Sequence, residues 1–160
     1  MHAAPYGQRT KQFEGVSTRL YNARFDANHS STRAALAEIR VAMELGGLDD
    51  MLVGRVEIAL AELFNNIAEH AYRDDGTGEV RCSMGIRGSS LVVEVTDQGG
   101  PMPGGEIPEG TLPDLDVAFE DLPEGGFGWH LIHAQTDAIS HMRLALGNCT
   151  RLNFDVQHGE

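Results

Sequence analysis

The chain has 160 residues, room for one domain of ordinary size, and its 24 acidic residues outnumber 12 basic ones, for a formal net charge of −12. This balance excludes a general nucleic-acid binder and a polybasic membrane anchor, because both need a basic face. No apolar run reaches the roughly eighteen residues of a membrane span, and residues 1–10 lack a signal-peptide pattern. We therefore expect a cytoplasmic protein.

The acidic surplus is unevenly placed. Residues 88–142 contain no Lys or Arg but ten acidic residues, a surplus that solubility alone would explain. The two cysteines, Cys82 and Cys149, lack the spacing of a metal site, which is typical of small buried side chains in a reducing compartment. The seven histidines form no metal-binding pattern either, so we expect no metal site built from protein ligands alone.

The first elements follow from local patterns. We expect a disordered lead-in over 1–15 and a single domain over 16–157. Loose alternation predicts a strand over 18–25. Apolar residues at helical spacing from Thr32 onward predict an amphipathic helix that ends at the glycine pair 46–47.

A second helix is predicted over 51–72. Its apolar stripe is wide and continuous, so we expect this helix to be largely buried. A turn over 73–78 follows. Two short β runs, 79–86 and 91–96, are separated by hairpin-length spacing at 88–90.

A long stretch rich in proline and glycine, 97–126, comes next, and we name residues 98–125 the lid. A loop of this length inside a compact domain is usually functional or disordered. A short helix is then predicted over 127–135. Two strands, 138–146 and 148–156, follow it and form a hairpin that turns at Gly147. This order predicts an α+β fold, a two-layer α/β sandwich with a mostly antiparallel sheet and helices on one face.

Polar residues border the apolar stripe of the second helix. Glu62, Asn66 and His70 are four apart, so they lie along one line of the helix surface. A carboxylate, an amide and an imidazole at the edge of a core are costly unless they have partners. Taken alone, they are more simply read as ordinary boundary residues.

Two glycine-containing motifs follow. Asp97 ends a β run two residues before Gly99, a pattern that marks either a common turn or a carboxylate beside a closely approached backbone. Gly126 and Gly128 stand at the start of the short helix, where free N–H groups and the helix dipole favour phosphate. Glycines are common in loops, so this motif alone is weak.

Together the three motifs resemble the GHKL (Bergerat) ATP-binding fold of histidine kinases, gyrase and MutL. The N box E-x-x-x-N corresponds to 62–66, the D-x-G box to 97–99 and the G-x-G box to 126–128. The strings ELFNNIAEHAY (62–72) and LPEGGFGWHLI (122–132) are similar to one bacterial branch, the anti-sigma-factor serine/threonine kinases of the RsbW and SpoIIAB type. The resemblance runs roughly from Arg19 to Phe154.

The resemblance implies roles for these residues. Asn66 would coordinate Mg²⁺, Glu62 would be the general base, and Asp97 would accept a hydrogen bond from the adenine amino group. Further ATP contacts are expected from Gly99, Gly126, Gly128 and Thr150. His70 matches the family pattern, in a role that is equally well structural.

The sequence also departs from the family. Position 129 is Trp where the family usually has Leu, so the edge of the nucleotide pocket is expected to differ. The lid contains no Lys or Arg, so any cationic partner for phosphate would come from elsewhere in the chain.

Three functions are compatible with the motifs. The family implies a homodimeric serine/threonine kinase of a partner switch, which binds a sigma factor, phosphorylates a STAS-domain antagonist and uses Arg33 at the partner surface. The alternative is a non-catalytic, ATP-dependent module that sequesters a sigma factor or another regulator. The ATPase domain of a histidine kinase is less well supported, because we expect no room for a helical hairpin carrying a phosphoacceptor histidine.

Overall fold

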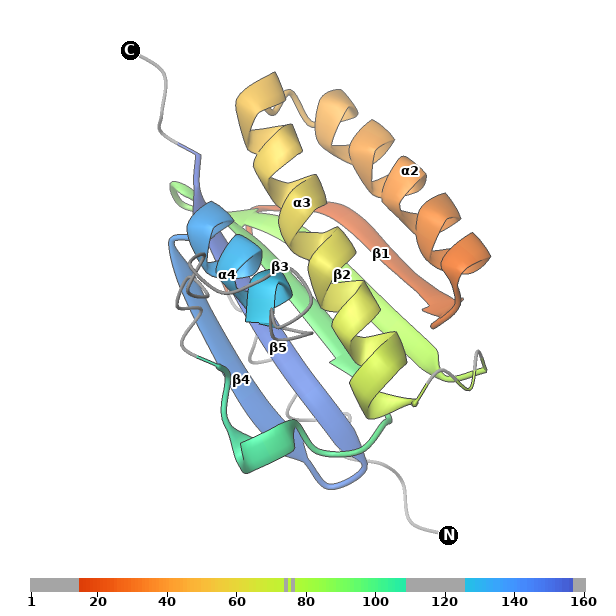
Figure 1. The fold of residues 1–160 in the computed structure, drawn as a ribbon. Helices are drawn as coiled ribbons and strands as arrows, with labels where there is room; N and C mark the ends of the chain where they lie inside the picture. The colour runs from red at the N-terminus through yellow and green to blue at the C-terminus, as the bar shows by residue number, and fades with distance from the viewer. Residues whose placement is uncertain (1–14, 74, 76, 109–125, 157–160) are drawn as a thin grey trace, which may run out of the picture.

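The computed structural model describes residues 15–73, 75, 77–108 and 126–156. All but one residue of the expected lead-in, and residues 109–125 of the lid, lie outside this part. Figure 1 shows helices stacked on one face of a single sheet. The predicted two-layer α+β architecture is therefore confirmed.

Among the described residues the sheet has five strands, and every neighbouring pair is antiparallel. In spatial order they are β1 (Thr18–Asp26), β2 (Glu79–Arg87), β3 (Ser90–Asp97), β5 (Gly147–Asp155) and β4 (Ala138–Leu144). The helices are α2 (His29–Leu45), α3 (Asp50–Asn66) and α4 (Gly126–Gln135). Figure 1 places α3 between the other two helices, so it is the central element of the helical layer.

Side-chain caps set where the first two helices begin. Asn28 accepts a hydrogen bond from the Ser31 backbone N–H at 2.8 Å, and Asp49 accepts one from that of Leu52 at 2.8 Å. Each cap satisfies a backbone donor that has no partner inside the helix. Because Asn28 is the cap, α2 starts three residues earlier than the apolar spacing from Thr32 indicates.

The end of α3 is less regular than predicted. Near the end of the expected helix, five residues form a wider π-helical turn, η2 (Ile67–Ala71). Tyr72 ties this end to the sheet, because its hydroxyl donates to the Glu79 carbonyl and accepts from the Gln98 backbone N–H, both at 2.6 Å. The chain therefore leaves α3 directly beside the carboxyl end of β3.

The core lies between α3 and the sheet. The apolar stripe of α3 is buried as predicted, and the Phe64 ring meets that of Phe25 edge to face at 4.9 Å between centroids. The strands contribute alternate residues to the same core, namely Val80, Cys82, Met84, Leu91, Val93, Val95, Leu152 and Phe154. Within the described residues, no helix has the length and apolar character needed to cross a membrane.

Both hairpins differ slightly from expectation. The first turns through Gly88 and Ser89 alone, because Ser90 already pairs with Arg87 and Gly88 adopts a φ of +58° that favours glycine. In the second, Gly147 is not the turn but the first residue of β5, paired with Leu144. A Cβ at Gly147 would collide with the Asp97 carbonyl oxygen, so only glycine allows this approach of β5 to β3.

Candidate nucleotide-binding site

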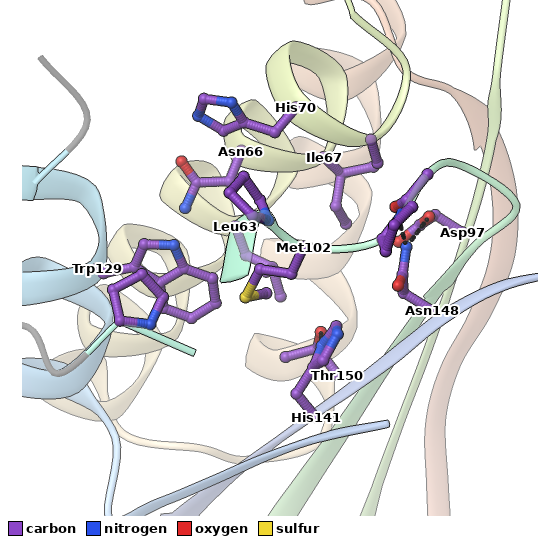
Figure 2. Close-up of a pocket in the computed structure, with 15 residues that line it drawn as sticks. Leu63, Asn66, Ile67, His70, Asp97, Met102, Trp129, His141, Asn148 and Thr150 are labelled. Carbon is purple, nitrogen blue, oxygen red and sulfur yellow. Dashed lines mark hydrogen bonds between the residues drawn. The ribbon is translucent and has the colours of Figure 1, made fainter. Parts of the chain in front are cut away.

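A cavity of about 210 Å³ opens between the helical layer and the sheet (Figure 2). A cavity of about 150 Å³ is enough to admit a benzene ring, so this one has room for a larger planar ring. Its lining residues come from α3, η2, β3, the described part of the lid, α4 and the last two strands. They are Leu63, Asn66, Ile67, His70, Ala71, Asp97, Gly100, Pro101, Met102, Pro103, Pro108, Trp129, His141, Asn148 and Thr150.

Strand register builds the sheet side of the cavity from two transverse rows. Asn148 on β5 lies between Asp97 on β3 and Arg143 on β4. Two residues further along β5, Thr150 lies opposite His141 on β4. Because side chains two apart on a strand share a face, both rows point toward the helices.

Asp97 is only 6% exposed, and its two carboxylate oxygens have different surroundings. Oδ1 accepts hydrogen bonds from Asn148 Nδ2 and from the Gly99 backbone N–H, both at 2.9 Å. Within the described chain, Oδ2 accepts none. Burial raises the pKa of the Asp97 carboxyl above its ordinary value, and the two hydrogen bonds partly oppose that change.

Asn148 and Arg143 hold the loop that follows Asp97. The second amide hydrogen of Asn148 reaches the Gly100 carbonyl, with Nδ2 at 2.8 Å, and Arg143 Nη1 donates to the Gly99 carbonyl at 2.8 Å. Arg143 Nη1 also lies 3.3 Å from Asn148 Oδ1. The sequence motifs gave no sign of these two residues, because only strand pairing brings them to Asp97.

Thr150 is 3% exposed, and its hydroxyl shares a hydrogen bond with His141 Nδ1 at 2.9 Å. Burial lowers the pKa of His141 below its ordinary value, although the nearby Asp97 carboxylate opposes this. The imidazole is therefore neutral at neutral pH. A hydroxyl, a neutral imidazole and a carboxylate together can read the polar edge of a flat heterocycle.

The first and third sequence motifs meet beside Asn66, at the opposite end of the cavity, although Glu62 and Gly128 are not among the residues that line it. Glu62 and Asn66 lie one turn apart on α3 and face the first turn of α4. A Cβ built on Gly128 would lie 3.0 Å from Glu62 Oε2 and 3.4 Å from Asn66 Oδ1. The amide and the carboxylate thus lie beside backbone N–H groups at a helix start, where the dipole favours phosphate oxygens.

Asn66 supplies the test of whether this end fits a magnesium nucleotide. Its Nδ2 is buried and has no hydrogen-bond partner in the part of the chain that the structure describes, which is costly in a protein without a ligand. A phosphate oxygen would accept from this nitrogen, and the neutral amide oxygen suits Mg²⁺. No cluster of three or more His, Cys, Asp and Glu side chains among the described residues could hold a metal by itself. The donor set therefore fits a cation that shares its coordination with phosphate.

Gly99 has a structural reason to be glycine. A Cβ there would approach the Ala71 carbonyl oxygen to 2.5 Å, so the absent side chain lets the loop pack against η2. The neighbouring Gly100 donates its N–H to the same carbonyl at 2.9 Å and lines the cavity, which Gly99 does not. A contact of Gly99 with a nucleotide remains a prediction.

The other predicted residues take varied positions. His70 lines the cavity but half of its side chain is exposed. Trp129 is 5% exposed and forms a wall opposite Asp97 (Figure 2). Gly126 begins α4 as predicted, whereas Arg33 lies on the exposed surface of α2, away from the cavity.

The comparisons with known proteins agree with this geometry. The family model described as "Histidine kinase-like ATPase domain" matches residues 25–154. Two relatives, the serine-protein kinases RsbW of Bacillus thuringiensis and of Bacillus anthracis, are each 29% identical over 134 residues, which cover 82% of this chain and 79% of theirs. These matches confirm the resemblance expected from the three motifs.

A solved structure supports the fold. The crystal structure of the RsbU and RsbW domains of a Mycobacterium tuberculosis protein matches with a TM-score of 0.57 at 18% sequence identity. The match covers 85% of this chain and 31% of that one. At this identity the likeness concerns the architecture alone.

Proposed function

Because the chain belongs to the histidine kinase-like ATPase domain family, we propose that its cavity binds ATP and that it is an anti-sigma-factor serine/threonine kinase. One observation carries the ATP site. The buried, unpartnered Nδ2 of Asn66 lies at one end of a cavity whose other end presents an open carboxylate oxygen of Asp97. The RsbW relatives support the choice of a serine kinase.

In this proposal the adenine ring lies on the sheet side of the cavity, where Asp97 Oδ2 accepts a hydrogen bond from the adenine amino group. Trp129 and Met102 cover the ring and exclude water. Asn66 binds the phosphate end with its amide, and the start of α4 donates backbone N–H groups to phosphate oxygens. Asn66 would hold Mg²⁺ together with the phosphates, and the ion would supply positive charge to offset the charge that develops during transfer.

Glu62 is the proposed general base. It lies one helical turn from Asn66 and against the start of α4, so its carboxylate is close to where the terminal phosphate would lie. From there it can accept the proton of a serine hydroxyl as the oxygen attacks. Binding of a nucleotide alone would not require this carboxylate.

The partners belong to the same proposal. The substrate would be a STAS-domain antagonist, modified on serine or threonine, and the alternative partner would be a sigma factor. We expect a cytoplasmic homodimer, with the exposed Arg33 on α2 at the partner surface. Cys82 and Cys149 are buried, and neither forms a disulfide bond within the described residues, which is compatible with a reducing compartment.

The test is phosphoryl transfer. The protein is incubated with γ-labelled ATP, Mg²⁺ and each STAS-domain protein of the source organism in turn, and the expected product is one of these proteins labelled on serine or threonine. Glu62→Gln protein provides the negative control. ATP binding without labelled product for any of them would contradict the kinase.

One observation favours a second candidate, a non-catalytic ATP-dependent binding module. Among the described residues that line the cavity, none is Lys or Arg. Arg143 lies near the end of the cavity proposed for adenine, not near the end proposed for the phosphates. The phosphate end therefore depends on backbone N–H groups, Asn66 and Mg²⁺. If wild-type protein binds ATP and captures a sigma factor but labels no STAS protein, this candidate replaces the kinase.

A further inference from the structure

We propose that Asn148 is a specificity-determining residue, which fixes Asp97 so that one bare acceptor oxygen faces the cavity and selects purines that carry a 6-amino group. Asn148 acts through Asp97 and is a positioning residue. The inference rests on the proposed ATP site, and it adds a residue that lies outside all three sequence motifs.

The hydrogen bonds of Asn148 show why it does not contact the ligand. Its two amide hydrogens go to Asp97 Oδ1 and to the Gly100 carbonyl, and its oxygen is 3.3 Å from Arg143 Nη1. The side chain is 3% exposed. Since its donors are already used, Asn148 has no N–H left to offer a nucleotide.

The same contacts give the two oxygens of Asp97 different roles. Oδ1 is occupied by Asn148 and by the Gly99 backbone N–H. Oδ2 keeps its lone pairs and, in an ionised carboxylate, can only accept. A ring edge with an N–H donor is therefore favoured there, and an edge with a lone pair or a bare C–H is not.

Without the Asn148 side chain, the Asp97 carboxylate would no longer be held in this orientation. The side chain lies directly opposite Asp97 in the β3–β5 pairing, 51 residues away in sequence. Without it, the Asp97 carboxylate would keep one local hydrogen bond, from Gly99, and could rotate about its last torsion. The Gly100 carbonyl would also lose its side-chain donor, although Arg143 would still hold the Gly99 carbonyl.

The test compares two ligands that differ in one group. ATP and purine riboside triphosphate share every atom except the 6-amino group, so the ratio of their dissociation constants reports recognition of that group. We expect wild-type protein to prefer ATP by about tenfold or more, as for a hydrogen bond to a charged acceptor. In Asn148→Ala the preference should fall below about threefold, mainly through weaker ATP binding.

A matched control separates positioning from general damage. Asn153 lies on the same strand but pairs with Val92 on the opposite face of the sheet, so Asn153→Ala should keep the wild-type preference. If Asn148→Ala weakens both nucleotides by the same factor, or leaves the ATP preference intact, the inference is wrong. If wild-type protein binds neither nucleotide, the proposed ATP site itself fails.

A second variant covers the case in which Asn148→Ala does not fold. Asn148→Asp keeps the shape but replaces the amide donor by a carboxylate facing Asp97. Two close carboxylates cannot both ionise easily, and a shared proton at lower pH restores a hydrogen bond between them. The preference for ATP should be lost at about pH 8 and partly return at about pH 6; the same preference at both pH values would overturn the role of Asn148.

Discussion

Glu62 on α3 lies against Gly128 on α4, so close that a Cβ on Gly128 would be 3.0 Å from Glu62 Oε2. That Cβ would also be 3.4 Å from Asn66 Oδ1. The glycine thus keeps open the space between a carboxylate, an amide and the start of a helix. This is the space in which we place the phosphates.

Substitution of Gly128 by alanine should separate binding from folding. The methyl group would fill this space, and we expect ATP affinity to fall by about tenfold or more. Alanine is the better helix former by about 1 kcal/mol, and the atom it would meet is the movable end of Glu62, so the fold should remain. Calorimetric titration and thermal unfolding measure the two effects; unchanged ATP affinity would show that phosphates do not use this space.

Glu62→Gln should remove transfer and keep binding. The amide retains the size of the side chain but cannot accept the serine proton, so we expect phosphorylation of the STAS partner to slow by about 10²–10⁴-fold. ATP affinity should stay within a few-fold of the wild type. Glu69→Gln is the control, because Glu69 is on η2 with 58% of its side chain exposed. Equal transfer rates in both variants would exclude Glu62 as the base.

Asn66→Ala should abolish binding of ATP with Mg²⁺ while the fold survives. The unpartnered Nδ2 contributes little to the free energy of unfolding without ligand, because a buried donor that has no partner is a cost. We therefore expect the melting temperature of the unliganded variant to equal or exceed that of the unliganded wild type. Adding ATP should no longer raise the melting temperature of the variant.

The neighbouring Asn65 supplies the control for this prediction. Its side chain is exposed on the same helix, so Asn65→Ala should keep the ATP-dependent rise in melting temperature. A full rise in Asn66→Ala would contradict the placement of the phosphates.

ATP binding should depend on the ionisation of Asp97. Burial raises the pKa of this carboxyl, so it becomes protonated at a higher pH than an ordinary aspartate, whose value is about 3.9. As the pH is lowered through that raised value, Asp97 loses its charged acceptor and ATP affinity should fall. Titrations at a series of pH values measure this step.

Asp97→Asn should lack the step, since an amide does not titrate, and should bind ATP about tenfold or more weakly at neutral pH.

Ionisation of Asp97 should have the opposite effect on the stability of the fold. A raised pKa means that the folded state disfavours the charge, so the stability present at low pH is lost as pH rises through the folded pKa. Asp97→Asn should therefore unfold at a higher temperature than wild type at neutral pH. A parallel pH profile for both proteins would remove Asp97 from the site.

Trp129 should report binding directly. It is the only tryptophan of the chain, is 5% exposed and lines the cavity. A base seated beside the indole should quench its fluorescence saturably, with the dissociation constant that calorimetry gives. Trp129→Leu should lose the signal and keep ATP affinity within a few-fold, since the family usually has leucine here. Unchanged emission at saturating ATP would place the base elsewhere.

Local patterns predicted much of this protein. The glycine pair that follows α2, the apolar stripe of α3 and the alternation of the strands act over a few residues, so they are visible in the sequence. The order of the N box, Asp97 and the glycine pair was enough to indicate the family, and the matched family model confirms it. The π-helical turn η2 was not predicted, because no residue of that segment differs from those of an ordinary helix.

The alignment of neighbouring strands could not be predicted from the sequence. Asn148 and Arg143 reach Asp97 only because β5 lies between β3 and β4 with one particular alignment, and a shift of one residue would turn both side chains to the other face of the sheet. Gly99 and Gly147 read as turn glycines, but each is required by a carbonyl that approaches from another element, at Ala71 and Asp97. The sequence by itself determined which chemical groups the site has. The packing of the whole sheet against α3 decided which oxygen of Asp97 remains open to a ligand, because that choice depends on a partner 51 residues away.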